Sequence, residues 1–147
     1  MGRKNNAEKG VAMRIINCIV TILLLAGMAL AAEKEKKVFK TAIDKDGIQR
    51  VAIFAGSFFF DPDYVVVRVN VPVEVTVKKE AEITPHAFVI DAPEAGLRIK
   101  EPLSAEPKVI KFTATRVGKY PFFCDKKFLF FKSHKERGME GVLDVTE

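Results

Sequence analysis

The sequence has no tryptophan, and only two histidines, two cysteines and two tyrosines among its 147 residues. It also lacks the extreme composition of disordered chains and multi-pass membrane proteins, since 48% of its residues are hydrophobic and 29% are charged. No internal repeat or low-complexity segment is present. The composition indicates one globular domain plus a tail, and twelve Phe with many Val can form its core without disulfides.

The net charge of +5 is concentrated at the N-terminus. Of the 24 Lys and Arg and the 19 Asp and Glu, residues 1–31 hold four basic side chains and one acidic side chain. The rest of the chain therefore carries 20 basic and 18 acidic residues, a net charge of +2. Such a balance is no electrostatic footprint for phosphate groups, so we expect no nucleic-acid partner.

Residues 1–31 predict a targeting segment. A basic stretch up to Arg14 precedes an apolar run of sixteen residues, Ile15 to Leu30, and small residues then stand where signal peptidase cleaves, before Ala32. This pattern is typical of a secretory signal peptide, so we expect a periplasmic or otherwise exported protein. The alternative is an uncleaved anchor, because the run is only slightly shorter than the roughly 20 residues that cross a bilayer. Membrane contact is expected only through this segment, if it is uncleaved.

Cleavage would leave a single cysteine in the mature chain. Cys18 lies inside the apolar run, so only Cys124 would remain. Exported proteins usually pair their cysteines, so an unpaired one needs an explanation. Cys124 could be a small buried hydrophobic residue, a metal ligand, a reactive thiol or half of an intermolecular bridge.

The residues that follow predict a β-sandwich. Valines occupy every second position in 64–69 and 73–77, the period of half-buried strands. Further strands are expected at 50–55, 58–60, 87–90, 97–99, 109–113, 120–123 and 142–145. Many short strands with turns at short spacing favour an antiparallel sandwich, preceded by a linker over 32–49.

The two histidines and the mature cysteine stand where a soft metal site would need them. His86 is expected at the start of a strand, Cys124 at the end of one, and His134 and Met139 in the loop that follows. Two imidazoles, one thiolate and a weak axial thioether form the donor set that favours copper in electron transfer. Each residue alone has an ordinary explanation, such as a hydrogen-bonded histidine or a core methionine, but the joint pattern indicates a metal site.

Four segments around these residues carry motifs of a known family. They are Gly-Ser-Phe-Phe-Phe-Asp-Pro at 56–62, Thr-Pro-His-Ala-Phe-Val-Ile at 84–90, Gly-Lys-Tyr-Pro-Phe-Phe-Cys at 118–124 and Gly-Met-Glu-Gly-Val-Leu-Asp-Val at 138–145. Together they resemble the cupredoxins, the blue-copper Greek-key sandwiches, of the short periplasmic kind. The resemblance covers residues 50–147 and implies one copper ion, cycling between Cu(I) and Cu(II), with His86, Cys124, His134 and Met139 as its ligands.

The spacing between Cys124 and His134 departs from this family. Familiar blue-copper domains place two to four residues between these ligands, whereas this chain places nine. A continuous helix would separate the two residues by roughly 15 Å, which is too far for one metal ion. Either a short helix or extended loop doubles back near Lys132-Ser133, or His134 is not a ligand. A dinuclear copper centre is excluded, because the second bridging thiolate is missing.

These observations favour an exported mononuclear copper protein that shuttles electrons to a redox partner. An enzyme is not expected, because no acid–base pair accompanies the site and four protein ligands leave no open position. The alternatives are a copper-binding or delivery module without redox turnover, and a metal-free sandwich used in adhesion or assembly. Four apolar residues at 128–131 beside Lys126, Lys127, Lys132 and Lys135 predict a docking surface for an acidic partner, unless Phe128 and Phe131 simply close the sandwich.

Overall fold

A computed structural model describes residues 38–81 and 83–147, which belong to one compact unit, Glu35–Glu147. The predicted targeting segment, residues 1–31, lies outside the described residues. The elements are β1 (Val38–Lys40), β2 (Gln49–Gly56), β3 (Phe59–Asp61), β4 (Tyr64–Arg68), β5 (Val73–Lys79), β6 (His86–Ala92), η1 (Pro93–Ala95), β7 (Leu97–Leu103), β8 (Lys108–Phe112), β9 (Gly118–Phe123), η2 (Lys135–Arg137) and β10 (Glu140–Thr146). In this described part, no helix has the length and apolar character needed to cross a membrane.

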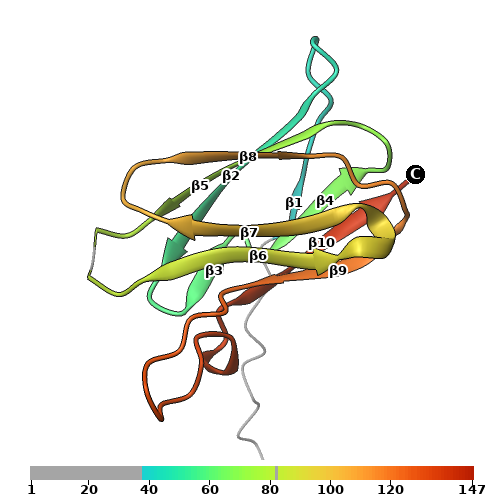
Figure 1. The fold of residues 1–147 in the computed structure, drawn as a ribbon. Coiled ribbons are helices and arrows are strands. Elements are labelled where there is room, and N and C mark those ends of the chain that lie inside the picture. The colour runs from blue at the N-terminus through green and yellow to red at the C-terminus, as the bar shows by residue number, and fades with distance from the viewer. Residues whose placement is uncertain (1–37, 82) are drawn as a thin grey trace, which may run out of the picture. The chain divides into compact units, whose positions relative to one another are not determined.

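The strands form a sandwich of two sheets (Figure 1). One sheet has the order β1-β4-β10-β9-β6-β7 and the other has the order β3-β2-β5-β8. The predicted all-β sandwich is therefore confirmed. The sheets are mixed, however, because β4 pairs in parallel with β1 and β10, and β2 pairs in parallel with β5. Parallel neighbours need a crossover connection, and the chain makes these crossovers between the two sheets.

Every strand range expected from the sequence coincides with an observed strand to within a few residues, but two regions differ. The expected linker over 32–49 contains β1 and a bridge between Ile43 and Gln49, so the sheets begin before residue 50. All three residues of β1 are exposed, and an exposed strand leaves no burial pattern in the sequence. The short strand expected at 97–99 extends to Leu103, because β7 is an edge strand, where Pro102 is tolerated.

The core between the two sheets is filled by the buried side chains that alternate with exposed ones along each strand. Phe60 of β3 packs edge to face against Phe88 of β6 and Phe122 of β9, with ring centroids 5.8 and 5.4 Å away. Phe88 and Phe122 are stacked at 5.2 Å. These rings join the two sheets, and both Phe88 and Phe122 are only 1% exposed. Because side chains alternate along a strand, residues two positions away from these rings also face the interior.

A buried glutamine joins the sheets elsewhere in the sandwich. Gln49, at the start of β2, is fully buried, and its Oε1 accepts hydrogen bonds from the Arg68 amide at 2.6 Å and the Thr41 hydroxyl at 3.0 Å. Its Nε2 donates to the carbonyls of Arg68 and Val71 at 3.2 and 3.4 Å. The buried amide therefore makes all four hydrogen bonds with neighbouring, partly buried groups.

We expect Gln49→Ala to lower the free energy of unfolding by about 2–3 kcal/mol, because it removes four hydrogen bonds made by a fully buried side chain. Urea unfolding followed by circular dichroism measures this loss. Thr41→Val removes one hydroxyl, which contacts both Gln49 Oε1 and the Val66 carbonyl, and leaves the glutamine amide in place, so it should cost about 1 kcal/mol or less. Equal losses in the two variants would contradict the role given to the Gln49 amide.

Candidate metal centre

Strand pairing brings the first two predicted ligands to one end of the sandwich. β6 and β9 are antiparallel neighbours, with Ile90 opposite Phe122. The start of β6 and the end of β9 therefore lie at the same end of the sheet. His86 is the first residue of β6, and Cys124 directly follows β9. Each lies two positions from a buried Phe, so both side chains face inward and are at most 1% exposed.

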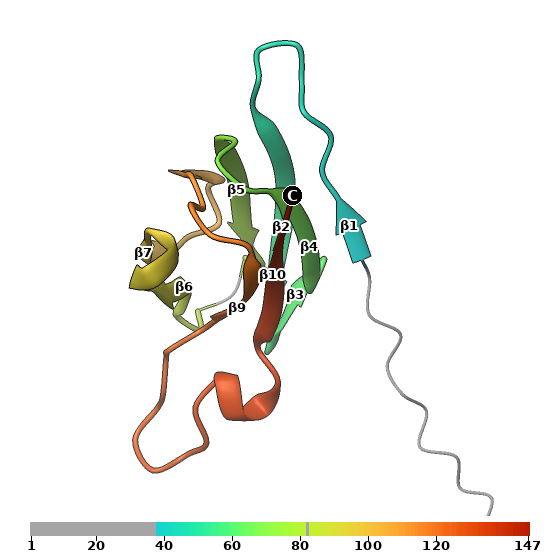
Figure 2. The ribbon, with the colours of Figure 1, turned by 90° about the vertical axis from the view of Figure 1, so that its right-hand side faces the viewer.

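The chain between Cys124 and His134 is an extended loop that doubles back, which is the second of the two predicted alternatives; the short helix is not formed over these residues. The His134 amide donates to the Lys126 carbonyl at 2.9 Å, which closes the loop at its base. A turn at its far end is closed by the Phe131 amide, which donates to the Phe128 carbonyl at 3.0 Å. Figures 1 and 2 show this loop protruding below the sheets. The loop closure returns His134 to Cys124 despite nine intervening residues.

The three side chains converge on one point. His86 Nδ1 and His134 Nδ1 are 3.2 Å apart, and Cys124 Sγ is 3.9 Å from the first and 3.5 Å from the second. A point equidistant from three such atoms lies about 2.1 Å from each, which matches the bond lengths of roughly 2.0–2.3 Å from a metal ion to imidazole or thiolate ligands. All three residues are buried. The described residues therefore contain a trigonal group of two imidazole nitrogens and one sulfur that fits a metal ion.

Met139 is placed next to this group by backbone hydrogen bonds. Its amide donates to the His134 carbonyl at 2.9 Å, and its carbonyl accepts from the Cys124 amide at 3.1 Å. The side chain is fully buried among core residues. These bonds hold Met139 beside two of the predicted ligands, and its role as the axial ligand stays a prediction.

Burial and hydrogen bonding have opposite effects on the pKa of the Cys124 thiol. Burial raises the pKa of Cys124, whereas hydrogen bonds from the backbone amides of Lys126 and Ala87 lower it, the latter lying 3.3 Å from Sγ. The net effect is a raised pKa, so the metal-free thiol is protonated at neutral pH. The same amides would orient the sulfur and stabilise its thiolate when a metal ion replaces the proton.

Three contacts with aromatic rings lie on the outer side of the site, and the sequence did not predict them. The Phe58 ring meets the His134 imidazole edge to face at 4.9 Å, and the Arg137 guanidinium lies 3.4 Å from the centre of the Phe58 ring. Lys135 lies 4.3 Å from the ring of Phe123. Phe58 has a positive φ of 64°, which is rare for a residue other than glycine. The Gly-Ser-Phe-Phe-Phe motif was the one signal that could have pointed to Phe58.

A family model described as a cupredoxin-like domain matches residues 17–139, so the chain belongs to the cupredoxin-like family. No curated protein matches the sequence. Solved structures with this fold include the metal-binding domain of a Cu(I)-exporting P-type ATPase from Streptococcus pneumoniae D39, crystallised with Cu(I). It has a TM-score of 0.58 and 23% identity, covering 78% of this chain and all of that one. Proteins of this family bind copper, and the His86, Cys124 and His134 group is where the described chain could hold it.

Two further structures show the same fold. A copper-binding protein solved by NMR in the apo form has a TM-score of 0.54 and 19% identity, covering 76% of this chain and all of that one. Auracyanin B has a TM-score of 0.52 and 16% identity, covering 73% of this chain and 94% of the other. At these identities the likeness defines the fold and leaves the function open.

We expect copper affinity to rise with pH near neutrality, because a metal ion must displace the proton that the raised pKa of Cys124 retains. At every pH below the raised pKa of Cys124, one thiol proton is released for each metal ion bound, so the affinity should rise about tenfold per pH unit. Competition with a coloured Cu(I) chelator measures this slope. A flat profile, or the same slope in Cys124→Ser, would contradict thiolate binding.

Proposed function

We propose that the protein is an exported mononuclear copper protein that carries one electron at a time. The observation that supports this most directly is the buried triangle of His86 Nδ1, His134 Nδ1 and Cys124 Sγ. With Met139 as a weak axial donor, these residues would provide thiolate and thioether for Cu(I) and imidazole for Cu(II). A donor set that suits both Cu(I) and Cu(II) favours repeated electron transfer, because the ligands rearrange little when the oxidation state changes.

The framework supports this role by holding the ligands in place. His86 belongs to a strand, Cys124 follows one, and the amide of Ala87 fixes the sulfur. His134 and Met139 are tied to each other and to Cys124 through the backbone. Bound copper would supply the one-electron couple, while the chain fixes its coordination and excludes water. Four protein donors would leave no position for a substrate, so we propose a carrier and not an enzyme.

A copper-binding or delivery module is the second candidate. The Streptococcus pneumoniae domain with the same fold is described with Cu(I), and delivery requires only that the site hold Cu(I). The two roles differ in what they predict for Cu(II): a carrier binds both oxidation states with a reversible potential, whereas a delivery module holds Cu(I) alone and is colourless. A metal-free sandwich used in assembly would bind no copper in either state.

Export and the redox partner are part of this proposal. The apolar segment before residue 32 supports export, with or without cleavage. An electron would leave through the side of the site next to Phe58, where His134 is 5% exposed and His86 only 1%. Arg137 places positive charge on that side, over the Phe58 ring, which favours an acidic redox partner protein.

Cys124→Ser should abolish the visible absorption of the Cu(II) protein and most of its copper affinity, because no other described residue supplies a thiolate. Metal analysis and visible spectroscopy of the purified protein measure both effects. In the full-length, uncleaved chain, Cys18→Ser is the matched control, since it removes the other cysteine and should leave the spectrum unchanged. Retention of the absorption band in Cys124→Ser would refute a copper–thiolate site.

Met139→Leu should retain copper but raise the reduction potential, because loss of a weak axial donor destabilises Cu(II) more than Cu(I). Protein-film voltammetry measures the change. Leu143→Met, a comparable exchange at another buried position, should leave the potential unchanged. If Met139→Leu also leaves the potential unchanged, Met139 is a core residue and no ligand.

A further inference from the structure

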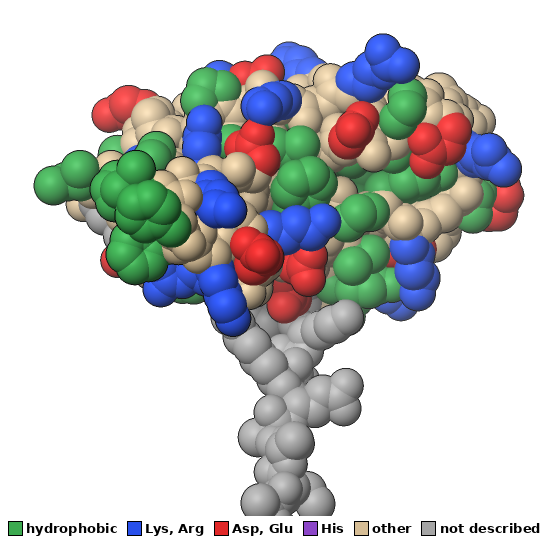
Figure 3. Space-filling model, turned by 60° about the horizontal axis from the view of Figure 1, so that its bottom comes forward, with side chains coloured by type: hydrophobic (Ala, Val, Ile, Leu, Met, Phe, Trp, Pro, Cys, Tyr) green, Lys and Arg blue, Asp and Glu red, His purple; other side chains and the backbone are tan. Residues whose placement is uncertain are grey.

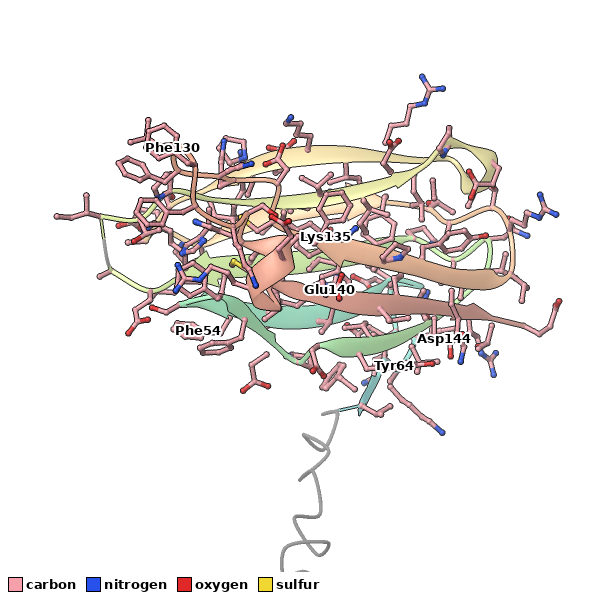
Figure 4. All side chains as sticks on the ribbon, turned by 90° about the horizontal axis from the view of Figure 1, so that it is seen from below. Phe54, Tyr64, Phe130, Lys135, Glu140 and Asp144 are labelled. Carbon is pink, nitrogen blue, oxygen red and sulfur yellow. The ribbon has the colours of Figure 1, made fainter. Side chains whose placement is uncertain are left out.

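The loop between Cys124 and His134 carries the most exposed apolar cluster near the site. Phe128, Leu129, Phe130 and Phe131 are 67%, 65%, 92% and 63% exposed. Phe128 and Phe131 stack on each other at 6.2 Å, and Phe130 projects from the end of the loop, as Figure 4 shows. In Figure 3 hydrophobic side chains gather at this end of the molecule. Only part of this cluster is covered by the protein itself.

Positive charge surrounds these apolar side chains. Lys126, Lys127 and Lys132 flank them in sequence, and residues 126–132 contain no acidic side chain. Two acidic residues lie nearby: Asp125 pairs with Lys100 at 2.7 Å, and Glu136 accepts hydrogen bonds from Ser133 and interacts electrostatically with Lys127 and Lys132. Three lysines near the apolar side chains against the single charge of Glu136 still leave a positive balance there. The loop therefore has an apolar tip flanked by three lysines, Lys126, Lys127 and Lys132, which we call the lysine collar.

We propose that this loop docks on an anionic lipid surface. Phenylalanine and leucine side chains enter the boundary between headgroups and acyl chains, while lysines beside them are attracted to anionic headgroups. The geometry favours lipid over an acidic protein. Phe128 and Phe131 line a pocket behind the loop, whereas Phe130 projects from its end, so these side chains do not share one face. A fluid acyl boundary can surround such a group, whereas one rigid protein face would cover only part of it. This contact is additional to any made by the N-terminal segment, and it does not depend on copper.

A pocket behind the loop adds apolar surface at the end of the sandwich that would face the lipid. It has a volume of about 490 Å³ and lies between Phe128 and Phe131 on one side and Ile83 and Pro85 on the other. Ile83 is fully exposed, so it adds a second apolar point at this end of the sandwich. His134 also lines the pocket. Docking through the loop would place the candidate metal centre next to the lipid surface.

The absence of tryptophan allows a local test. Phe130→Trp places a single indole at a position that is 92% exposed and tolerates the change. With the full-length chain, we expect its emission to shift to the blue and to be quenched by brominated lipids when vesicles of phosphatidylcholine and phosphatidylglycerol are added. The probe reports only the loop, so binding through the N-terminal segment does not mimic this result.

Ile43→Trp is the matched control. Ile43 lies in the 41–48 hairpin, at the opposite end of the domain from the loop (Figures 1 and 2), and it is 43% exposed. Its indole should show neither a shift nor quenching with the same vesicles. The proposal is overturned if the two probes respond equally, or if the indole at position 130 does not respond to anionic vesicles.

The lysine collar gives a second, quantitative test. In the Phe130→Trp background, Lys127→Gln with Lys132→Gln should weaken partitioning into the anionic vesicles about 30-fold, from about 1 kcal/mol for each lysine. Vesicles of phosphatidylcholine alone should produce a weaker response. A response to soluble polyglutamate, with none to vesicles, would overturn the lipid proposal and favour an acidic protein.

Discussion

The candidate metal centre depends on the pairing of β6 with β9. Antiparallel pairing places the first residue of β6 and the residue that follows β9 at the same end of the sheet. The buried Phe88 and Phe122 determine which face of each strand points inward. His86 and Cys124 share the parity of these rings, so both side chains enter the interior. A shift of one residue in either strand would turn its ligand outward and expose its ring. Core packing and the metal site are therefore specified by the same register.

Most strands could be predicted because their buried positions are occupied by regularly spaced apolar residues. Valine at every second position marks β4 and β5, and phenylalanine marks β3, β6 and β9. Strand β1 left no such record, since all of its residues are exposed and it is held only by backbone pairing with β4. The parallel pairs were also missed, because strand direction within a sheet follows from the path of the chain between sheets. Local periodicity contains no information about that path.

The candidate ligands could be predicted because histidine and cysteine are scarce in this chain and lie in recognisable motifs. The route that returns His134 to Cys124 could not, since it depends on a hydrogen bond between the Lys126 carbonyl and the His134 amide, and backbone groups are the same in every residue. The stack of Arg137, Phe58 and His134 was missed for a related reason. It joins residues from two distant segments, and nothing near either one indicates the other.

The attachment of β1 determines how the domain would respond to force. β1 lies parallel to β4 over three residue pairs, and Thr41 continues the contact through two hydrogen bonds to the Val66 carbonyl, at 3.0 Å from its amide and 2.9 Å from its hydroxyl. A pull on the chain before Val38, directed along the strand, would load these bonds together in shear instead of opening them one after another. The pull would act on the β1 edge of the six-stranded sheet, and three strands separate β1 from β6, which begins at His86. A load on β1 would therefore reach first the edge strand that lies farthest, within its sheet, from the strands next to Cys124.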